Sequence, residues 1–294
     1  MRPLTALVTC LLFATSPLHG QDSAQDDRIG RLKASVTGSG PHETAKLRER
    51  DGIRNGSGYD GATIYYPTDA KGPLPGIVIV PGFMASERSV SRWGPFLASH
   101  GIVTMTIGTN QRNAMPEARA DALLDAVTTL EAENTRKESP LNGRLDTERI
   151  GVGGWSMGGG GAQQAAVQDP DLDVVLALCP WKPGHSFNHP VPVMILAGED
   201  DTPAPPSMHA LVHFRKTPDT TPRLYYEVRD GSHSLAYSPT NADGDVGRIA
   251  LTWLKCFLSD EEEYLVLLEE EPRSAKRFLL ELPDEGPPNG NQPG

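Results

Sequence analysis

One pentapeptide restricts the fold of this chain more than any other feature. Gly154-Trp155-Ser156-Met157-Gly158 follows the pattern G-x-S-x-G, in which the serine sits on a sharp strand-to-helix turn above the edge of a sheet. The flanks agree, because residues 149–153 are of strand type and small residues fill 159–167, as in a helix packed close to a sheet. Only small residues fit beside so strained a turn. The run therefore predicts a strand, a turn and a helix, with Ser156 as a nucleophile.

Two other interpretations of this glycine-rich run were weighed. A mere flexible loop is disfavoured, because the motif and its strand-turn-helix context agree. A dinucleotide phosphate loop is excluded, because residues 151–156 lack the third glycine at the required spacing.

The rest of the chain alternates between apolar runs and helical patterns. Strands are expected at 63–66, 76–80, 102–107, 150–153, 174–178, 193–197 and 224–228, and helices at 86–99, 118–132, 206–214 and 247–258. This alternation predicts an α/β protein with a mostly parallel central sheet and helices on both faces. A chain of 294 residues is long enough for one such domain. Together with the serine turn, the pattern indicates the α/β-hydrolase fold. The segments between the expected strands contain no long insertion, so we expect no lid domain.

The start of the chain has the pattern of a secretory signal peptide over residues 1–20, with Arg2 before an apolar stretch at 4–14. That stretch is too short to span a bilayer. We therefore expect an exported, soluble protein, extracellular or periplasmic, with no integral membrane segment. Residues 21–57 are expected to form a flexible lead-in and a first strand region, and residues 58–259 the catalytic domain.

The last segment, residues 260–294, is expected to be an acidic tail that is partly disordered. Residues 260–285 carry ten acidic and three basic side chains, which is much of the formal net charge of −11. The apolar groups at 264–268 and 278–280 could pack on the domain as a strand or a helix, whereas the chain from 283 is rich in glycine and proline. The remainder is only mildly acidic, which argues against nucleic-acid binding.

A serine nucleophile needs a base, which is in turn held by an acid. In this fold the three follow in the order serine, acid, histidine. His233 lies in a turn directly after the strand at 224–228, and catalytic groups in such sheets follow strand ends. His233 is therefore the expected base. The acid should follow the strand at 193–197, where Glu199, Asp200 and Asp201 all qualify and spacing alone does not choose among them.

Four other histidines form two pairs with i, i+4 spacing, His185 with His189 and His209 with His213. Such spacing can bind a metal ion, but no third ligand is near in the sequence. We interpret them as ordinary surface histidines and expect no metal site. Of the three cysteines, Cys179 and Cys256 are expected to be separate buried thiols, and Cys10 leaves with the signal peptide.

The negative charge that forms on the attacked carbonyl oxygen needs two backbone N–H donors. One should be Met157, directly after the nucleophile, and the other should come from the loop 81–85 after the strand at 76–80. Phe83 is the best placed donor in that loop.

At these residues the chain resembles a known family. The segments that carry the likeness are PGFMASERSVSRWGPFLASHGIVTMTIGTN, LDTERIGVGGWSMGGGG, CPWKPG, VPVMILAGEDDTPAP and DGSHS. They are similar to bacterial cutinases and polyester hydrolases, the group that includes the PET hydrolases, from about Gly58 to Leu258. The resemblance implies Ser156 as nucleophile, Asp201 as acid and His233 as base.

The same resemblance places Phe83 and Met157 in the oxyanion hole, and it places Phe83 and Trp181 beside the substrate, where Trp181 can stack on an aromatic acyl group. His209 matches the family's usual residue near that cleft, where it would contribute to substrate binding. Ser234 stands where many cutinases have Phe, and we expect it to leave room beside His209 for Trp181 to change rotamer. The C-terminal disulfide of many members is absent, because no cysteine follows Cys256.

Together these features predict a secreted serine ester hydrolase that cleaves cutin-like or PET-like polyesters through an acyl-enzyme, as a monomer and without a cofactor. The alternative within enzymes is a general carboxylesterase or triacylglycerol lipase with the same three residues. A dienelactone-type hydrolase fits less well, because that group usually has a cysteine nucleophile. A catalytically inactive binding module is disfavoured by a complete set of catalytic residues in the right order.

Overall fold

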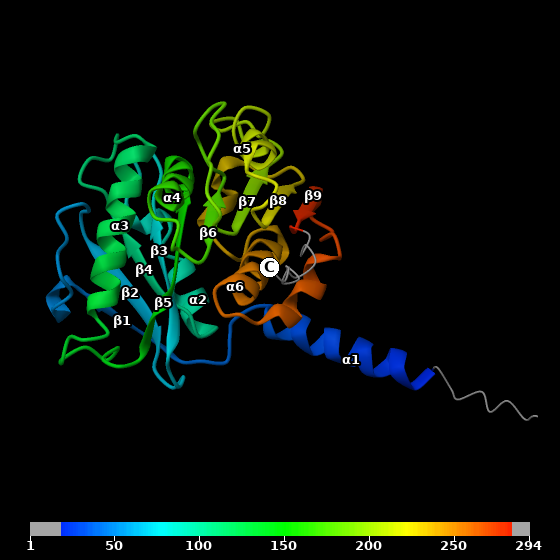
Figure 1. Ribbon diagram of the computed structural model, residues 1–294, viewed down its shortest axis with the longest axis horizontal. Coiled ribbons are helices and arrows are strands. Elements are labelled where there is room, and N and C mark those ends of the chain that lie inside the picture. Colours follow the sequence, from blue (N-terminus) through cyan, green and yellow to red (C-terminus); the bar gives the residue numbers. More distant parts are fainter. Residues whose placement is uncertain (1–18, 284–294) are drawn as a thin grey trace, which may run out of the picture.

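A nine-stranded sheet runs through the protein, with helices on both of its faces (Figure 1). The computed structural model describes residues 19–283. In chain order the strands are β1 (Thr44–Arg48), β2 (Ala62–Pro67), β3 (Leu74–Val80), β4 (Val103–Ile107), β5 (Leu145–Trp155), β6 (Val175–Leu178), β7 (Val193–Gly198), β8 (Arg223–Val228) and β9 (Ala275–Glu281). Their order across the sheet is β1-β2-β4-β3-β5-β6-β7-β8-β9. The six strands from β4 to β8 in this order are parallel, and β1, β2 and β9 pair antiparallel at the two sides. The predicted α/β-hydrolase architecture is confirmed.

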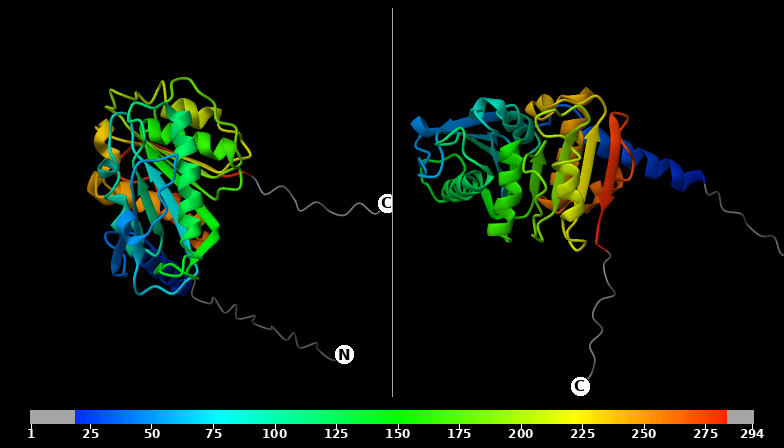
Figure 2. Two further views of the ribbon diagram at one scale, coloured as in Figure 1. Left: turned by 90° about the vertical axis from the view of Figure 1, so that its left-hand side faces the viewer. Right: turned by 90° about the horizontal axis from the view of Figure 1, so that it is seen from above.

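The helices lie in two layers, one on each side of the sheet (Figure 2). The longer segments are α1 (His19–Ser35), α2 (Trp93–Ser99), α3 (Pro116–Ala132), α4 (Met157–Gln168), α5 (Ala210–Lys216) and α6 (Asp245–Phe257). Helices α3, α4 and α5 share one core with the sheet, and α2 and α6 share the other. Strand β3 shows why the central strands are apolar throughout: Val78 and Val80 belong to the first core, whereas Ile77 and Ile79 belong to the second.

Several expected elements differ from the structure in extent, and the helix expected at 206–214 begins only at Ala210, as α5. The helix expected at 86–99 is a 3₁₀ turn at Glu87–Ser89 followed by α2. Hydroxyl groups explain the break, because Ser89 and Ser91 donate side-chain hydrogen bonds to nearby backbone carbonyls and so compete with helix formation. The strand expected at 150–153 extends over Leu145–Trp155. Its first residues lie beside the start of β3, where Leu145 pairs with Leu74.

The segment after residue 20 is a helix and not the expected irregular lead-in. Helix α1 covers His19–Ser35 and extends away from the body beside the C-terminal segment (Figure 1). Few side chains fix it: Leu32 is buried in the core, Arg28 pairs with Glu263 at 2.9 Å, and the Ser35 hydroxyl lies 2.9 Å from that of Tyr264. Because so few of its described side chains are buried, this segment has no periodic apolar pattern that would predict a helix. The expected signal peptide falls mostly on residues 1–18, outside the described residues.

The acidic C-terminal segment is largely part of the fold. Its first apolar group forms a 3₁₀ helix, η5 (Glu262–Leu268), in which Tyr264, Leu267 and Leu268 are buried. Its second apolar group lies in β9, which pairs antiparallel with β8. The folded domain therefore continues to Glu281 instead of ending at 259, and the expected disordered end at 284–294 lies outside the described residues. No helix within residues 19–283 is long and apolar enough to cross a membrane.

Candidate active site

Five loops that carry the expected site residues meet at one edge of the sheet. Parallel strands end at the same edge, and neighbouring strand ends are in register here, such as Val80 with Gly154 and Gly198 with Val228. Strands β4 and β5 lie on opposite sides of β3, so the chain changes direction across the sheet at β3. Ligand sites in open α/β sheets form outside the carboxyl ends of the strands at such a point.

Ser156 occupies a strained turn between β5 and α4, with φ of 60° and ψ of −121°. A side chain in this left-handed region is strained, and strain of this kind is common at catalytic positions. The glycines are required by close packing, because a Cβ on Gly154 would lie 2.3 Å from the Gly158 carbonyl carbon. A Cβ on Gly158 would lie 2.5 Å from the Val80 carbonyl oxygen. The G-x-S-x-G pattern therefore follows from the space that the turn leaves.

Ser156, His233 and Asp201 form one hydrogen-bonded row. The Ser156 Oγ lies 2.9 Å from His233 Nε2, and His233 Nδ1 lies 2.8 Å from Asp201 Oδ2. A carboxylate oxygen accepts a hydrogen bond, so Nδ1 carries the hydrogen and Nε2 is left to accept the hydrogen of the serine hydroxyl. Asp201 is buried, at 3% exposed, and its other oxygen accepts the Ala204 N–H at 2.8 Å.

The geometry separates the three acids that spacing left open. Only Asp201 reaches the histidine. Glu199 instead accepts the backbone N–H of Asp230 at 3.1 Å and pairs with Lys276 of β9 at 2.8 Å. It therefore joins the loop that carries Asp201 to the loop that carries His233. Asp200 is exposed.

Sequence reasoning did not assign two aromatic residues near the histidine, Trp155, which packs against it, and Tyr237, which packs against Trp155. The Trp155 Nε1–H donates to the His233 carbonyl oxygen at 3.0 Å, and the two rings lie 5.1 Å apart. The ring of Tyr237 packs edge-on against Trp155 at 4.6 Å. Trp155 stands inside the motif, so its position beside the nucleophile was visible in the sequence, but the position of Tyr237 depends on the turn after His233.

The loop after β3 lies against Ser156. A Cβ on Gly82 would lie 2.7 Å from the Ser156 Cβ, and the next residue, Phe83, has half of its surface exposed. Within residues 19–283, neither the Phe83 N–H nor the Met157 N–H donates to a protein acceptor. Both expected donors are therefore available to an oxygen atom of a substrate.

A buried arginine, which the sequence did not single out, holds this loop. The Arg119 guanidinium on α3 donates to the carbonyl oxygens of Pro81 at 2.8 Å, Arg112 at 2.9 Å and Ala114 at 3.2 Å. Burial lowers the pKa of Arg119 to about 10, so it stays a cation at neutral pH. The same Arg112 carbonyl accepts the Met84 N–H at 2.7 Å. One charge-assisted bond thus holds Pro81 of this loop directly, and the other two hold the connection after β4, to which Met84 of the loop is bound.

Trp181 adjoins Ser156 through its backbone. Its N–H donates to the Ser156 carbonyl oxygen at 2.8 Å, and its half-buried ring lies 5.6 Å from the ring of His209. His209 is only 3% exposed, and its Nδ1 accepts the Lys182 N–H at 3.0 Å. His209 therefore lies behind Trp181.

The expectation of ordinary surface histidines is wrong for three of the four. His189, His209 and His213 are buried, and His185 is half-buried. The reason is that the long connection between β6 and β7 folds over α5, which no local pattern indicates. The expected cysteines are confirmed as separate buried thiols, and burial raises the pKa of Cys256 to about 12. Across the described residues, no group of three or more His, Cys, Asp or Glu is arranged to hold a metal ion.

Comparisons with known proteins agree with this architecture. Residues 25–286 match the PETase family, described as PET hydrolase-like. A bis(hydroxyethyl) terephthalate hydrolase of Streptomyces coelicolor is 36% identical over 219 residues, which are 74% of this chain and 68% of that protein. A cutinase of Thermobifida fusca is 32% identical over 273 residues, 92% of this chain and 86% of the relative. Cutinase est1 of Thermobifida alba is 33% identical over 237 residues, 80% and 77% of the two chains.

Proposed function

This chain belongs to the PET hydrolase-like family, and from that membership we propose that it is a secreted serine hydrolase that cleaves the ester bonds of polyesters. The relatives give the class of reaction, carboxylic ester hydrolysis, since one is named for bis(hydroxyethyl) terephthalate and others are named cutinases. The observation that carries the proposal is the hydrogen-bonded row of Ser156, His233 and Asp201 at a strained turn.

In the proposed mechanism, the Ser156 hydroxyl attacks the ester carbonyl while His233 Nε2 takes its proton. Asp201 holds the ring in the required tautomer and offsets the charge of the imidazolium. The N–H groups of Phe83 and Met157 donate to the oxyanion, and each such donor lowers the barrier by about 3–4 kcal/mol. His233 then gives its proton to the departing alcohol. Water, deprotonated by the same histidine, finally releases the acid from the acyl-enzyme.

The proposed binding site for the acyl group lies between Phe83 and Trp181. Phe83 presents an exposed ring on the oxyanion side, and Trp181 is held next to the nucleophile by its backbone. An aromatic acid fits between two such rings, because offset and edge-on aromatic contacts are favourable. His209 is buried behind Trp181, which supports a role in holding that ring more than direct contact with the substrate.

Three further features belong to the proposal: export through a signal peptide at residues 1–20, a catalytic domain that includes residues 58–259, and a monomeric state. The relatives named cutinase favour export. All strands from β1 to β9 belong to a single sheet, which favours one catalytic domain that extends through β9.

The test compares the protein from residue 21 with two serine variants. Ser156→Ala removes the nucleophile, and Ser57→Ala makes the same chemical change at an exposed serine away from the site. Acid release is measured from aromatic and aliphatic polyester films and from p-nitrophenyl butyrate. We expect the parent and Ser57→Ala to degrade film, and Ser156→Ala to lose roughly 10⁴-fold or more in rate on every ester.

Each other outcome refutes a named part of the proposal. If the parent protein cleaves p-nitrophenyl butyrate and no film, the polyester assignment fails and a carboxylesterase or lipase remains. If Ser156→Ala keeps its rate, the assignment of the nucleophile fails.

A further inference from the structure

A buried cation, Arg119 of α3, lies between the loop after β3 and helix α4. Its side chain is completely buried, and across the described residues no carboxylate pairs with it. All three nitrogen atoms of the guanidinium instead donate to backbone carbonyl oxygens, those of Pro81, Arg112 and Ala114. A cation buried without a counter-charge costs free energy, so a role other than ion pairing has to account for Arg119.

The bonds of Arg119 hold the loop 81–85 on both sides of the proposed donor Phe83. Before Phe83, the Nη1–H donates to the Pro81 carbonyl oxygen at 2.8 Å. After it, the Nη2–H donates to the Arg112 carbonyl oxygen at 2.9 Å, and that oxygen accepts the Met84 N–H at 2.7 Å. Phe83 therefore lies between two fixed points that depend on one guanidinium.

The backbone of Met84 shows that the loop needs this support. Its φ is 55°, in the left-handed region that residues other than glycine seldom occupy. Such a conformation persists only where its surroundings enforce it. The bond from the Met84 N–H to the Arg112 carbonyl oxygen is a contact that does so. Without Arg119 to hold that carbonyl group, we expect the loop to relax and the Phe83 N–H to turn away from Ser156.

The same arginine accounts for a glycine beyond the serine motif, Gly161. A Cβ on Gly161 would lie 2.8 Å from the Arg119 Cβ, so α3 approaches α4 this closely only because no side chain stands there. A Cβ on Gly158, inside the motif, would lie 2.7 Å from the Pro81 carbonyl oxygen, which accepts the Arg119 N–H. The loop 81–85 is thus packed against the start of α4, where the second proposed donor, Met157, stands.

From this arrangement we propose that Arg119 is the positioning residue of the oxyanion hole, which fixes the Phe83 N–H at the distance from the Met157 N–H that one oxyanion requires. The inference rests on the proposed function for the reaction, whereas its structural part concerns the loop 81–85 alone. The Arg119 side chain is completely buried and its hydrogen bonds go to backbone carbonyl oxygens, so it acts on the ester only through the loop.

The test uses three substitutions of buried arginines. Arg119→Met keeps most of the volume of the side chain and removes every donor. Arg119→Lys keeps the charge but replaces the planar fork with a single ammonium group, which cannot serve the same three acceptors. Arg223→Met is the matched control, because Arg223 is also buried and donates to a backbone carbonyl oxygen, that of Thr217, but stands at the start of β8, at the opposite edge of the sheet.

Two measurements are made on each protein. The first is hydrogen exchange of the backbone amides at 82–86 by mass spectrometry, which needs no activity. The second is the pair of kcat and KM for p-nitrophenyl butyrate, whose acylation and deacylation both pass through an oxyanion.

For Arg119→Met we expect faster exchange at 82–86 and a kcat lowered about 100-fold, as for the loss of one oxyanion donor. We expect KM to change less than about twofold, because the interaction is made in the transition state. Arg119→Lys should lie between Arg119→Met and the parent in both measurements. Arg223→Met should lower Tm and leave kcat and the exchange at 82–86 unchanged.

The inference is overturned if exchange at 82–86 is the same in Arg119→Met and in the parent, whatever the activities show. It is also overturned if KM rises while kcat is unchanged. A loss of kcat in Arg223→Met as large as in Arg119→Met overturns it too, because Arg119 would then act through general stability.

If Arg119→Met does not fold, Arg119→Lys decides in its place, and a kcat and an exchange rate equal to those of the parent overturn the inference. A parent protein that hydrolyses no ester contradicts the proposed function, whereas the exchange result still decides whether Arg119 holds the loop.

Discussion

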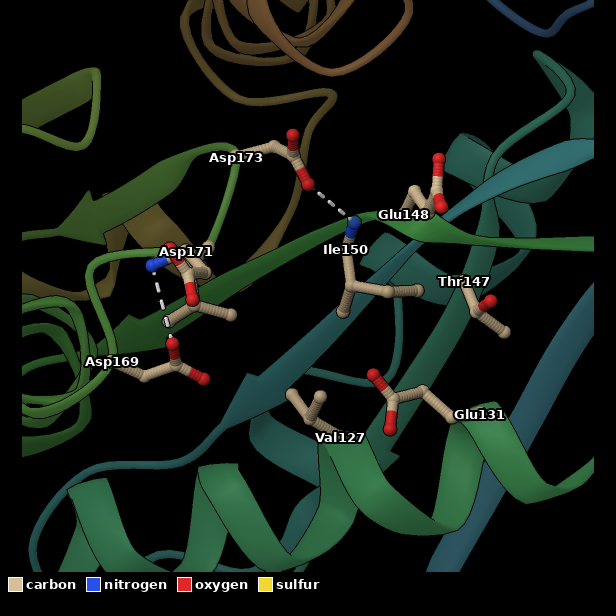
Figure 3. A pocket seen from close by; sticks show the side chains of 9 residues that line it. Val127, Glu131, Thr147, Glu148, Ile150, Asp169, Asp171 and Asp173 are labelled. Atoms are coloured by element: carbon tan, nitrogen blue, oxygen red, sulfur yellow. Dashed lines mark hydrogen bonds between the residues drawn. The ribbon is translucent and has the colours of Figure 1, made fainter.

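Asp173→Asn should stabilise the folded protein at neutral and alkaline pH. Asp173 comes just before β6, at the edge of the sheet opposite to the proposed active site, and it lines a pocket rich in carboxylates, including Glu131, Asp169 and Asp171 (Figure 3). Its Oδ2 accepts the Ile150 N–H at 2.7 Å. Burial raises the pKa of Asp173 to about 6 in spite of that bond, and the charges of Asp260 and Asp146 add to the rise.

The sign and size of the effect follow from this shift. The carboxyl has an ordinary pKa of 3.8, so the folded state holds the proton more tightly than the unfolded state does. The resulting stability is complete below pH ~4 and is lost as the pH rises through about 6. A shift of about two pH units corresponds to ~3 kcal/mol for a group removed from water. Because Asp173 is only half-buried, screening reduces this to roughly 1 kcal/mol.

Asparagine is neutral at every pH and can still accept the Ile150 N–H through its side-chain oxygen. We therefore expect Asp173→Asn to raise Tm by about 2–4 °C at pH 8, and to leave Tm unchanged near pH 4. Thermal unfolding followed by circular dichroism at the two pH values is the assay. Asp171→Asn is the control, because it removes the same charge from an exposed position in the same pocket.

Three results would refute the reasoning. A gain of equal size in Asp171→Asn would mean that net charge, and not the burial of Asp173, is responsible. A gain that persists near pH 4 would mean that ionisation is not its cause. A lower Tm of Asp173→Asn than of the parent at pH 8 would show that the ionised carboxylate gains more free energy from its hydrogen bond to Ile150 than it loses by burial.

Three other perturbations have expected outcomes. Gly82→Ala should lower kcat by about 100-fold or more with the fold retained on circular dichroism, because the added Cβ would lie 2.7 Å from the Ser156 Cβ and displace the loop that we propose binds the oxyanion. Lys276→Gln should lower Tm slightly by removing the ion pair to the loop that carries the proposed catalytic acid, and ~1 M NaCl should abolish the difference from the parent, since the Debye length is then ~3 Å. Cys179 and Cys256 are buried with raised thiol pKa values, so a thiol reagent such as DTNB should label neither in the native protein and both in guanidinium chloride.

The elements that could be predicted from sequence are those whose cause is local. The turn at Ser156 needs glycines at fixed positions because the backbone itself leaves no space for a Cβ, and that requirement is visible in a single sequence. The central strands are buried on both faces, so their apolar runs are uninterrupted, as in β3. Local sequence could not distinguish Asp201 from Glu199 and Asp200, because the distinction depends on which way the loop after β7 turns toward His233.

The parts that were missed depend on segments distant in the chain. The i, i+4 histidines of α5 have the spacing of an exposed helix face, and only the connection between β6 and β7 that covers them makes them buried. Helix α1 is held by η5, more than 200 residues later, through contacts such as Arg28 with Glu263. Strand β9 was left open as a strand or a helix, because the charged residues on its solvent side conceal its place in the sheet.

The two outer strands also affect how molecules of this protein meet one another. Strand β1 presents Lys46 and Arg48, and strand β9 presents Lys276 and Arg277, at the two borders of the sheet. Edge strands are the usual starting points of aggregation, because their backbone groups can pair with another chain. If two molecules paired through their edge strands, the cations on these strands would be brought together and removed from water. These charged borders oppose pairing of the sheet with a second molecule, which should help to keep the protein dispersed at high concentration and during heating.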